Sequence, residues 1–299
     1  MDLPVTVIGG YLGAGKTTLV NHLLRHADGL RYAVLVNEFG DLSIDADLIE
    51  AEEDGMISIS GGCVCCAFGN DLIGALDDML AMRPRPDHVL IEASGVALPA
   101  SIAASVGLVQ GMRVDGVLVL ADADQIRANA ANTYLSDTIT RQLAQADIVL
   151  LTKADLIDAA GLERLTTWLR SQAPGTRIVP VVQGAVPAEA ILGALPLAAR
   201  GRTVGPAAHG LFDSVVLRPD GPVDAADLAR ALADDPGVTR AKGFVDTRDG
   251  LVLIHVVGHR RTVEPATGDH PIGVVCIGLK AEFDPARVRA LAGGNADGR

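Results

Sequence analysis

Short runs of apolar residues alternate with helix-like stretches through the first two thirds of the chain. The runs are nearly continuous in Val, Leu and Ile, as expected of parallel strands that are covered on both faces. They lie at residues 5–8, 32–37, 56–60, 89–94, 116–122, 147–153 and 177–182. Between them, stretches such as 16–27 and 70–80 repeat apolar residues at the spacing of one helical face. This alternation predicts an α/β fold with a doubly wound, mostly parallel sheet.

The pattern changes after residue 185. Residues 186–209 are rich in Pro and Gly around one short helical pattern, which indicates a linker. Residues 210–292 then predict a small α+β domain, with a strand, a helix, a pair of strands, a further strand and a last helix. Asp249-Gly250 is a favourable hairpin turn between the paired strands. We expect domains at 1–185 and 210–292, followed by a flexible tail at 293–299.

Composition narrows the classes of partner. The 299 residues are 49% hydrophobic, which is enough for one large and one smaller core. Lys and Arg total 25 against 37 Asp and Glu, a formal net charge of −12, and no basic run stands out. Nucleic acid and anionic membranes are therefore not expected as partners. No apolar stretch is long enough to span a bilayer and the N-terminus does not resemble a signal peptide, so we expect a cytoplasmic protein.

One segment carries a phosphate-binding pattern. GYLGAGKT, from Gly10 to Thr17, fits G-x-x-x-x-G-K-[ST] and lies between a predicted strand and a predicted helix. Its glycines let backbone N–H groups face phosphate oxygens, and the helix N-terminus adds partial positive charge. Lys16 would reach the β and γ phosphates, and the Thr17 hydroxyl would bind Mg²⁺. The predicted phosphate contacts are Gly10, Tyr11, Leu12, Gly13, Ala14, Gly15, Lys16, Thr17 and Thr18.

A later strand end predicts the identity of the base. In LLTKAD, Asp155 could accept hydrogen bonds from the N1 and N2 donors of guanine, a pair that adenine lacks. The stem of Lys153 could lie over the flat base. Thr152 stands where GTPases usually have Asn, and Ala154 completes the segment. The alternative is an ordinary charged turn between a strand and a helix.

The strand VLIEAS ends in a carboxylate beside the phosphate loop. Glu92 could hold the Mg²⁺ shell or a water there, and Gly95 could offer its N–H to a γ-phosphate. A buried salt bridge is the alternative for Glu92. No Gln follows Gly95, so intrinsic hydrolysis is expected to be slow.

Three of the four cysteines lie within four positions, at Cys63, Cys65 and Cys66. In a reducing compartment such clusters indicate metal or redox chemistry. Three thiolates suit a tetrahedral Zn²⁺ with an open fourth position, and they could also hold Cu(I) or Co²⁺. A thiol redox switch and simple packing are the alternatives. The fourth cysteine, Cys276, stands in an apolar strand and is expected in a core.

An acidic loop lies between the phosphate loop and the cysteines. NEFGDLSID carries Glu38, Asp41 and Asp45 directly after a predicted strand. Such a loop could sense the γ-phosphate and Mg²⁺, and it could lend an oxygen ligand to the thiol site. A solvated acidic loop is the alternative.

Taken in order, these motifs resemble those of the CobW-type GTPases, relatives of UreG and HypB. GYLGAGKTTLVNHLL, NEFGDLSID, GGCVCC, LIEASGVALP and LLTKAD carry the resemblance over about residues 4–185, and the C-terminal segment is similar to the family's C-terminal domain. The resemblance implies that Lys16, Thr17, Glu38 and Glu92 serve GTP hydrolysis. It implies a cargo site of Cys63, Cys65, Cys66 and Asp41, with Mg²⁺ on Thr17 and Glu92.

The implied function is that of a GTPase of low intrinsic rate that acts as a metallochaperone. It would bind Zn²⁺ or Co²⁺ at the Cys-x-Cys-Cys site and couple delivery to a client metalloprotein to GTP hydrolysis. The resemblance leaves open whether the protein forms a nucleotide-dependent homodimer. Two other classes remain, a phosphate-loop kinase for a small molecule and a redox-sensing regulatory GTPase. Three features depart from the family pattern: Thr152 in place of Asn, Asp41 where some members have Glu, and no His-rich tract.

Overall fold

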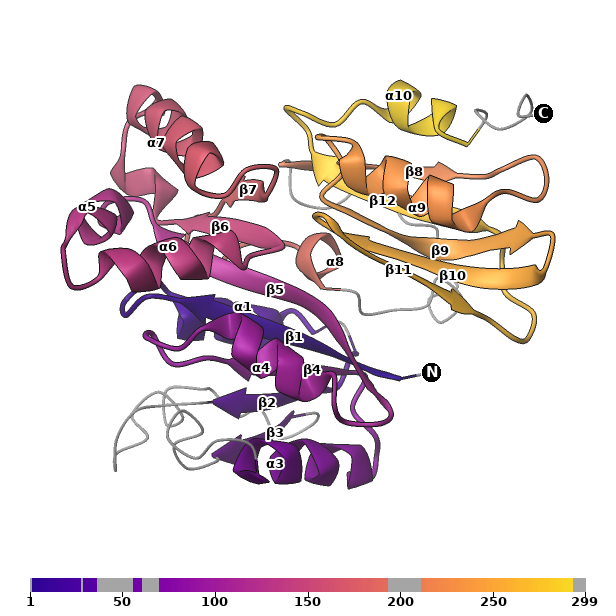
Figure 1. The fold of residues 1–299 in the computed structure, drawn as a ribbon, viewed down its shortest axis with the longest axis horizontal. Coiled ribbons are helices and arrows are strands. Elements are labelled where there is room, and N and C mark those ends of the chain that lie inside the picture. The colour runs from indigo at the N-terminus through magenta and orange to yellow at the C-terminus, as the bar shows by residue number, and fades with distance from the viewer. Residues whose placement is uncertain (1, 28, 37–55, 61–69, 193–210, 293–299) are drawn as a thin grey trace. The chain divides into compact units, whose positions relative to one another are not determined.

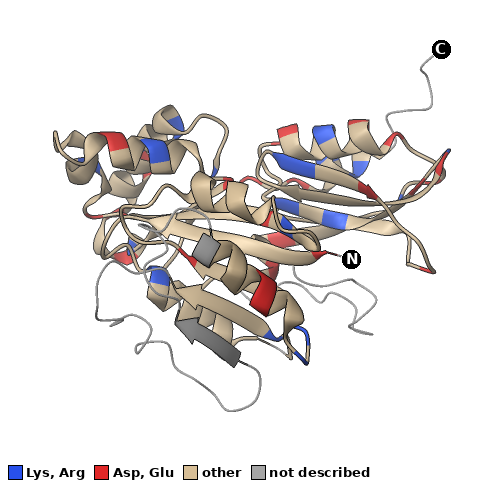
Figure 2. Ribbon diagram, turned by 60° about the horizontal axis from the view of Figure 1, so that its bottom comes forward, with Lys and Arg blue, Asp and Glu red and all other residues tan. Residues whose placement is uncertain are grey.

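The computed structural model describes residues 2–27, 29–36, 56–60, 70–192 and 211–292. The chain divides into two compact units, Met1–Ala188 and Glu189–Arg299, and each is described by itself. No helix in these ranges is long and apolar enough to cross a membrane. Figure 2 shows acidic and basic residues interspersed over the helices and strands of both units.

The first unit contains a seven-stranded sheet in the order β3-β2-β4-β1-β5-β6-β7, and every neighbouring pair is parallel (Figure 1). The predicted α/β class is confirmed, with a sheet that is parallel throughout. The strands are β1 Leu3–Gly10, β2 Tyr32–Val36, β3 Met56–Ser60, β4 His88–Glu92, β5 Met112–Asp122, β6 Ile148–Thr152 and β7 Arg177–Pro180. Because all are parallel, their carboxyl ends lie along one edge of the sheet.

Helices cover both faces of this sheet. They are α1 Lys16–Arg25, α3 Asn70–Ala81, α4 Pro99–Val106, α5 Ile126–Ala131, α6 Ser136–Ala144 and α7 Ala159–Gln172, with a 3₁₀ turn η1 at Ala154–Leu156. The short helix α8 Ala188–Ile191 spans the boundary between the two units. Apolar residues of α3 to α7 pack with Val5 and Val7 of β1 in one buried cluster. The alternate residue Thr6 points to the other face, where its hydroxyl contacts the buried His88 ring at 2.8 Å and α1 buries Leu19 and Leu23.

The second unit contains a five-stranded sheet in the order β11-β10-β9-β12-β8, with antiparallel neighbours throughout. Its elements are β8 Phe212–Leu217, α9 Ala225–Asp234, β9 Arg240–Thr247, β10 Gly250–Val257, β11 Arg260–Pro265, β12 Gly273–Leu279 and α10 Pro285–Ala290. The helices bury Leu228, Leu232 and Val288 against one face of the sheet. Cys276 lies in this core with no exposed surface, and burial raises the pKa of its thiol to about 12. Its expected core position is confirmed.

Two details of this unit differ from the sequence expectations. Strand β11 was not predicted, because RRTVEP contains little apolar alternation and takes its conformation from pairing with β10. The hairpin between β9 and β10 turns at Arg248 and Asp249, since Thr247 pairs with Gly250. Gly250 follows the turn with a φ of 119°, where glycine is favoured.

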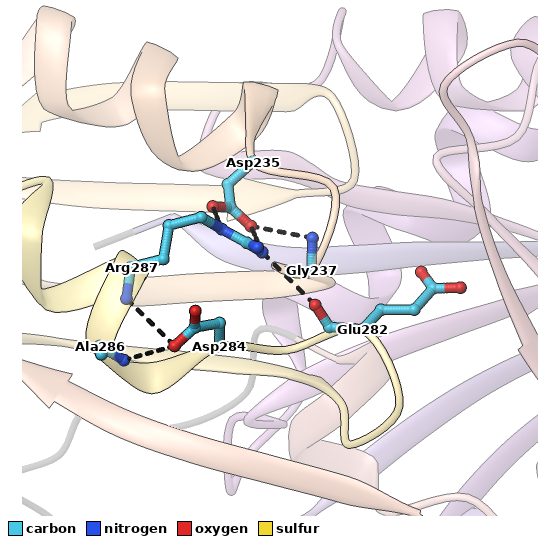
Figure 3. A network of polar contacts seen from close by, with 6 residues as sticks. All are labelled: Asp235, Gly237, Glu282, Asp284, Ala286 and Arg287. Carbon is cyan, nitrogen blue, oxygen red and sulfur yellow. Dashed lines mark hydrogen bonds and ion pairs between the residues drawn. The ribbon is translucent and has the colours of Figure 1, made fainter.

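A polar network joins the end of α9 to the start of α10 (Figure 3). Arg287 donates to both carboxylate oxygens of Asp235, from Nε at 2.6 Å and from Nη2 at 2.9 Å. Asp235 also accepts the N–H of Gly237 at 2.8 Å. Asp284 caps α10 through the N–H groups of Ala286 and Arg287. Burial alone would raise the pKa of Asp235, but the hydrogen bonds from Arg287 and Gly237 and the Arg287 charge outweigh it, so that pKa is lowered.

Candidate nucleotide-binding site

The predicted phosphate loop connects β1 to α1, at the carboxyl edge of the parallel sheet. Gly13 and Gly15 have φ values of 73° and 91°, which favour glycine. Gly10 has a φ of 130°, and a Cβ there would lie 2.4 Å from the Leu120 carbonyl oxygen of β5. All three positions therefore favour glycine by their backbone conformation, and at Gly10 there is also no space for a side chain. The resulting turn leads directly into the N-terminus of α1, where an anion is favoured.

Lys16 folds back over this loop. Its Nζ donates to the Gly10 carbonyl at 3.1 Å and to the Tyr11 carbonyl at 3.4 Å, and the residue is 8% exposed. The first turn of α1 contains Thr17 and Thr18 and no acidic residue. A buried ammonium beside a helix N-terminus is an arrangement that attracts phosphate oxygens, and those would replace the carbonyl contacts.

Thr17 and Glu92 meet at the same edge. The Thr17 hydroxyl donates to Glu92 Oε1 at 2.9 Å, and Glu92 is 2% exposed at the end of β4. The strands place it there, because Glu92 pairs in register with Ile8, two residues before the loop. A hydroxyl and a carboxylate are hard oxygen donors of the kind that Mg²⁺ prefers. The donor set therefore fits Mg²⁺.

The segment after β4 passes close to the phosphate loop. A Cβ on Gly95 would lie 2.8 Å from the Leu12 backbone nitrogen, so the two loops approach closely only because this residue is glycine. Gln142 of α6, which is 1% exposed, donates to the Gly95 carbonyl at 3.1 Å and to the Ala97 carbonyl at 2.8 Å. Sequence reasoning missed Gln142, because a single Gln within a helical pattern gives no sign of its distant partners.

The predicted base segment is attached to the phosphate loop. Thr152 ends β6, and its hydroxyl donates to the Ala14 carbonyl at 2.8 Å, with a longer contact of 3.3 Å to Ala121. Thr152 is shorter than the Asn that GTPases usually have here, and its hydroxyl links the base segment directly to the phosphate loop. Asp155 follows in η1 with an exposed side chain, so its carboxylate is accessible to a ligand.

Lys153 has a partner that the sequence did not indicate. Its Nζ lies 2.5 Å from Asp122 Oδ2, at the end of the neighbouring strand β5. The run GVLVLAD already ended in this carboxylate, as VLIE ends in Glu92, and that common position is the signal that could have identified Asp122. The sequence predicted that the methylene stem of Lys153 lies over the base. The ion pair with Asp122 holds the ammonium group at the tip of that stem.

The predicted cargo site lies outside the described residues, as do the switch carboxylates. This applies to Glu38, Asp41, Asp45, Cys63, Cys65 and Cys66. Within the described ranges, no three His, Cys, Asp or Glu side chains gather as metal ligands would. The strands that precede both segments are described. Val36 ends β2 and pairs with both Glu92 of β4 and Ser60 of β3, so all three strands end together.

Comparison with known proteins supports the resemblance. The sequence-family model of the CobW/HypB/UreG nucleotide-binding domain matches residues 4–180. The family model of the cobalamin synthesis protein CobW C-terminal domain matches residues 212–292. The zinc chaperone CobW of Sinorhizobium sp is 31% identical, with 96% of each chain covered. The zinc chaperone YjiA of Escherichia coli (strain K12) is 31% identical, with 77% of this chain and 76% of YjiA covered.

Among solved structures, the Zn(II)-bound YjiA GTPase from E. coli covers 99% of this chain and 100% of its own, at 24% identity and a TM-score of 0.45. The sequence matches span both units, and the phosphate loop, Glu92 and the Thr152–Asp155 segment lie within the first matched domain. The chain therefore belongs to the CobW/HypB/UreG family and carries the CobW-type C-terminal domain.

Proposed function

We propose that this protein is a GTP-hydrolysing metallochaperone that binds Zn²⁺ through Cys63, Cys65 and Cys66 and couples its delivery to the nucleotide state. The observation that carries the proposal is the common end of β2, β3 and β4. Val36, Ser60 and Glu92 are in register, so the chain enters the acidic segment and the cysteine segment from the edge that holds Thr17 and Glu92. Relatives named as zinc chaperones support Zn²⁺ as the cargo, with Co²⁺ as the alternative.

In this proposal the phosphate loop binds and orients GTP. Lys16 exchanges its carbonyl contacts for phosphate oxygens and neutralises charge that develops during transfer of the γ-phosphoryl group to water. Thr17 and Glu92 would hold Mg²⁺, which supplies further charge neutralisation. The Gly95 N–H, in a loop fixed by Gln142, donates to the γ-phosphate. Asp155 accepts from the N1 and N2 groups of guanine and disfavours adenine.

The two nucleotide states would differ in affinity for the metal. In this scheme the GTP-bound state favours metal binding by the segments that carry Glu38, Asp41 and the three cysteines, and hydrolysis lowers that affinity. Zn²⁺ requires thiolates, so binding releases protons and becomes tighter as pH rises. Useful gating needs unequal metal affinity in the two states, because a nucleotide that bound both conformations equally would shift nothing. A client metalloprotein then takes the metal, and a nucleotide-dependent homodimer is compatible with this scheme.

A competitive metal titration tests the proposal. Reduced, Mg²⁺-loaded protein is titrated with Zn²⁺ and with Co²⁺ in GDP and in a non-hydrolysable GTP analogue. We expect one tightly bound metal ion per chain, with about tenfold or greater affinity in the GTP state, a coupling of about 1.4 kcal/mol. Cys65→Ala should abolish tight metal binding and leave GDP affinity unchanged.

Cys276→Ala is the matched control, because it removes a thiol from the core of the other unit and should leave metal affinity unchanged. Equal metal affinity in both nucleotide states would refute the gating and leave a simple metal-binding protein. Retention of tight binding by Cys65→Ala would refute the cysteine site. Reversible oxidation of the thiols without stoichiometric metal would favour a redox regulator.

A further inference from the structure

The end of β5 carries a carboxylate that belongs to none of the predicted motifs. Asp122 is the last residue of β5 and pairs in register with Thr152 at the end of β6. Its side chain is 9% exposed, and a carboxylate removed from water needs polar partners. One oxygen accepts the N–H of Asp124 at 2.9 Å, and the other lies 2.5 Å from Lys153 Nζ. The carboxylate therefore connects the ends of two neighbouring strands.

Lys153 has a backbone conformation that lysine rarely adopts. Its φ is 55°, in the left-handed region. Such residues persist where the surrounding contacts hold them, and they gather at functional sites. The backbone is held on both sides, because Ala123 N–H donates to the Thr152 carbonyl at 2.9 Å and Leu156 N–H to the Lys153 carbonyl at 3.0 Å. Asp122 adds a restraint at the tip of the side chain.

The Asp122–Lys153 pair is poorly placed to act as a stabilising ion pair. The Lys153 side chain is 40% exposed, and ion pairs that remain open to water contribute little to folding. The pair does determine orientation. It ties the tip of the Lys153 side chain to the end of β5, and Lys153 itself lies two residues before the exposed Asp155. The contact orders the one side chain of this segment that was expected to lie against a base.

We propose that Asp122 is a positioning residue for guanine recognition, an inference that rests on the proposed binding of GTP. The carboxylate holds the Lys153 ammonium so that the methylene stem is ordered before the nucleotide arrives, ready to lie along the face of a planar base. Binding then costs less rotamer entropy than it would with a free lysine. Asp155 distinguishes the base by its edge donors, while Asp122 acts only through Lys153.

The test uses Asp122→Asn, which keeps the side-chain size and an acceptor for Asp124 N–H but removes the charge. Asp137→Asn is the charge-matched control, because Asp137 forms an exposed ion pair with Arg141 on α6. Calorimetry gives the dissociation constants of GDP, IDP and inorganic tripolyphosphate for the wild type and both variants. We expect Asp122→Asn to weaken the binding of GDP and of IDP by the same factor, about fivefold. This is the order expected when one side chain must be ordered on binding.

Tripolyphosphate affinity should stay within about twofold in the same variant, because tripolyphosphate has no base that could contact Lys153, and the control should match the wild type. Lys153→Met and the double variant complete a mutant cycle. Since Asp122 acts through Lys153, the double variant should bind GDP as Lys153→Met does.

Three results would overturn the role of Asp122. The first is an unchanged GDP affinity in Asp122→Asn. The second is an equal loss of tripolyphosphate affinity in that variant, which would indicate a distorted site. The third is a loss of GDP affinity in the double variant that equals the product of the two single losses. A separate comparison tests the function on which the inference depends. A wild type that binds ADP as tightly as GDP would overturn guanine specificity, whatever the Asp122 variants show.

Discussion

Thr17 and Glu92 show how two residues far apart in the chain form one oxygen site. The hydroxyl follows the phosphate loop and the carboxylate ends β4, yet their oxygens are 2.9 Å apart. The carboxylate is almost fully buried. The Thr17 hydroxyl and the Glu92 carboxylate are hard oxygen donors that would hold a bound Mg²⁺.

Glu92→Gln therefore tests the site at the level of one charge. The amide keeps an acceptor for the Thr17 hydroxyl, so the fold and GDP binding in excess EDTA should be retained. Mg²⁺-dependent GTP hydrolysis should fall by about 100-fold, the order seen when one preorganised electrostatic contact is removed. Phosphate release under steady-state conditions measures the effect.

Glu163→Gln, on the exposed face of α7, is the control for Glu92→Gln and should hydrolyse GTP at the wild-type rate. Wild-type hydrolysis by Glu92→Gln at saturating Mg²⁺ would show that this carboxylate serves neither the metal nor the attacking water.

At the scale of elements, the parallel strands bring the predicted residues together, and polar contacts between elements hold the loops in place. Thr152 links the base segment to the phosphate loop, and Gln142 of α6 links to the segment after β4. In the second unit, the bidentate contact of Arg287 with Asp235 joins α10 to the end of α9 (Figure 3). These contacts determine where helices and loops sit relative to the sheets.

The Asp235 contact predicts a pH dependence for the stability of the second unit. Because its folded-state pKa is lowered, the stabilisation is fully present above the ordinary value of 3.8 and is lost as pH falls through the folded-state pKa. Asp235→Asn should lower the free energy of unfolding at pH 7 by about 1–2 kcal/mol, with allowance for the exposure of Arg287. The difference from wild type should shrink below about pH 4.

Urea unfolding at pH 7 and at pH 3, followed by circular dichroism, measures this difference. The neighbouring Asp234→Asn is the control, because Asp234 is exposed on α9 and should change stability little at either pH. A difference between Asp235→Asn and wild type that is the same at both pH values would show that the charge of Asp235 is not the stabilising feature.

At the scale of the whole molecule, each unit has its own hydrophobic core. The first is built on the parallel sheet and the second on the antiparallel sheet with α9 and α10. Every described residue of the candidate nucleotide site belongs to the first unit. The two cores can therefore be perturbed separately.

Leu232→Ala tests this separation. Leu232 is fully buried in the second core, so truncation should destabilise that unit by about 2–5 kcal/mol. GDP affinity should stay within about twofold of wild type, because no described contact of the site involves this core. Urea unfolding and a GDP titration of the intact protein measure the two effects.

Leu108→Ala, at a side chain that is 76% exposed, is the control for Leu232→Ala and should change neither quantity. If Leu232→Ala lost GDP binding under conditions where the first unit remains folded, the nucleotide site would depend on the second unit.

The sequence by itself determined the class of the first unit and the place of the glycine loop between β1 and α1. Buried parallel strands are continuous apolar runs, and a glycine loop between a strand and a helix is encoded within eight neighbouring residues, Gly10 to Thr17. Glu92, Asp155 and Cys276 could also be interpreted from their neighbours. Such features depend on local pattern, which a sequence displays directly.

Only the tertiary structure decided which distant groups meet. Asp122 faces Lys153, Gln142 donates to Gly95 and Ala97, and the Thr152 hydroxyl reaches Ala14. These contacts depend on strand order and register, and a single polar residue carries no sign of a partner that lies 30 or more positions away. For the same reason β11, whose residues have weak strand preference, became a strand only through pairing with β10.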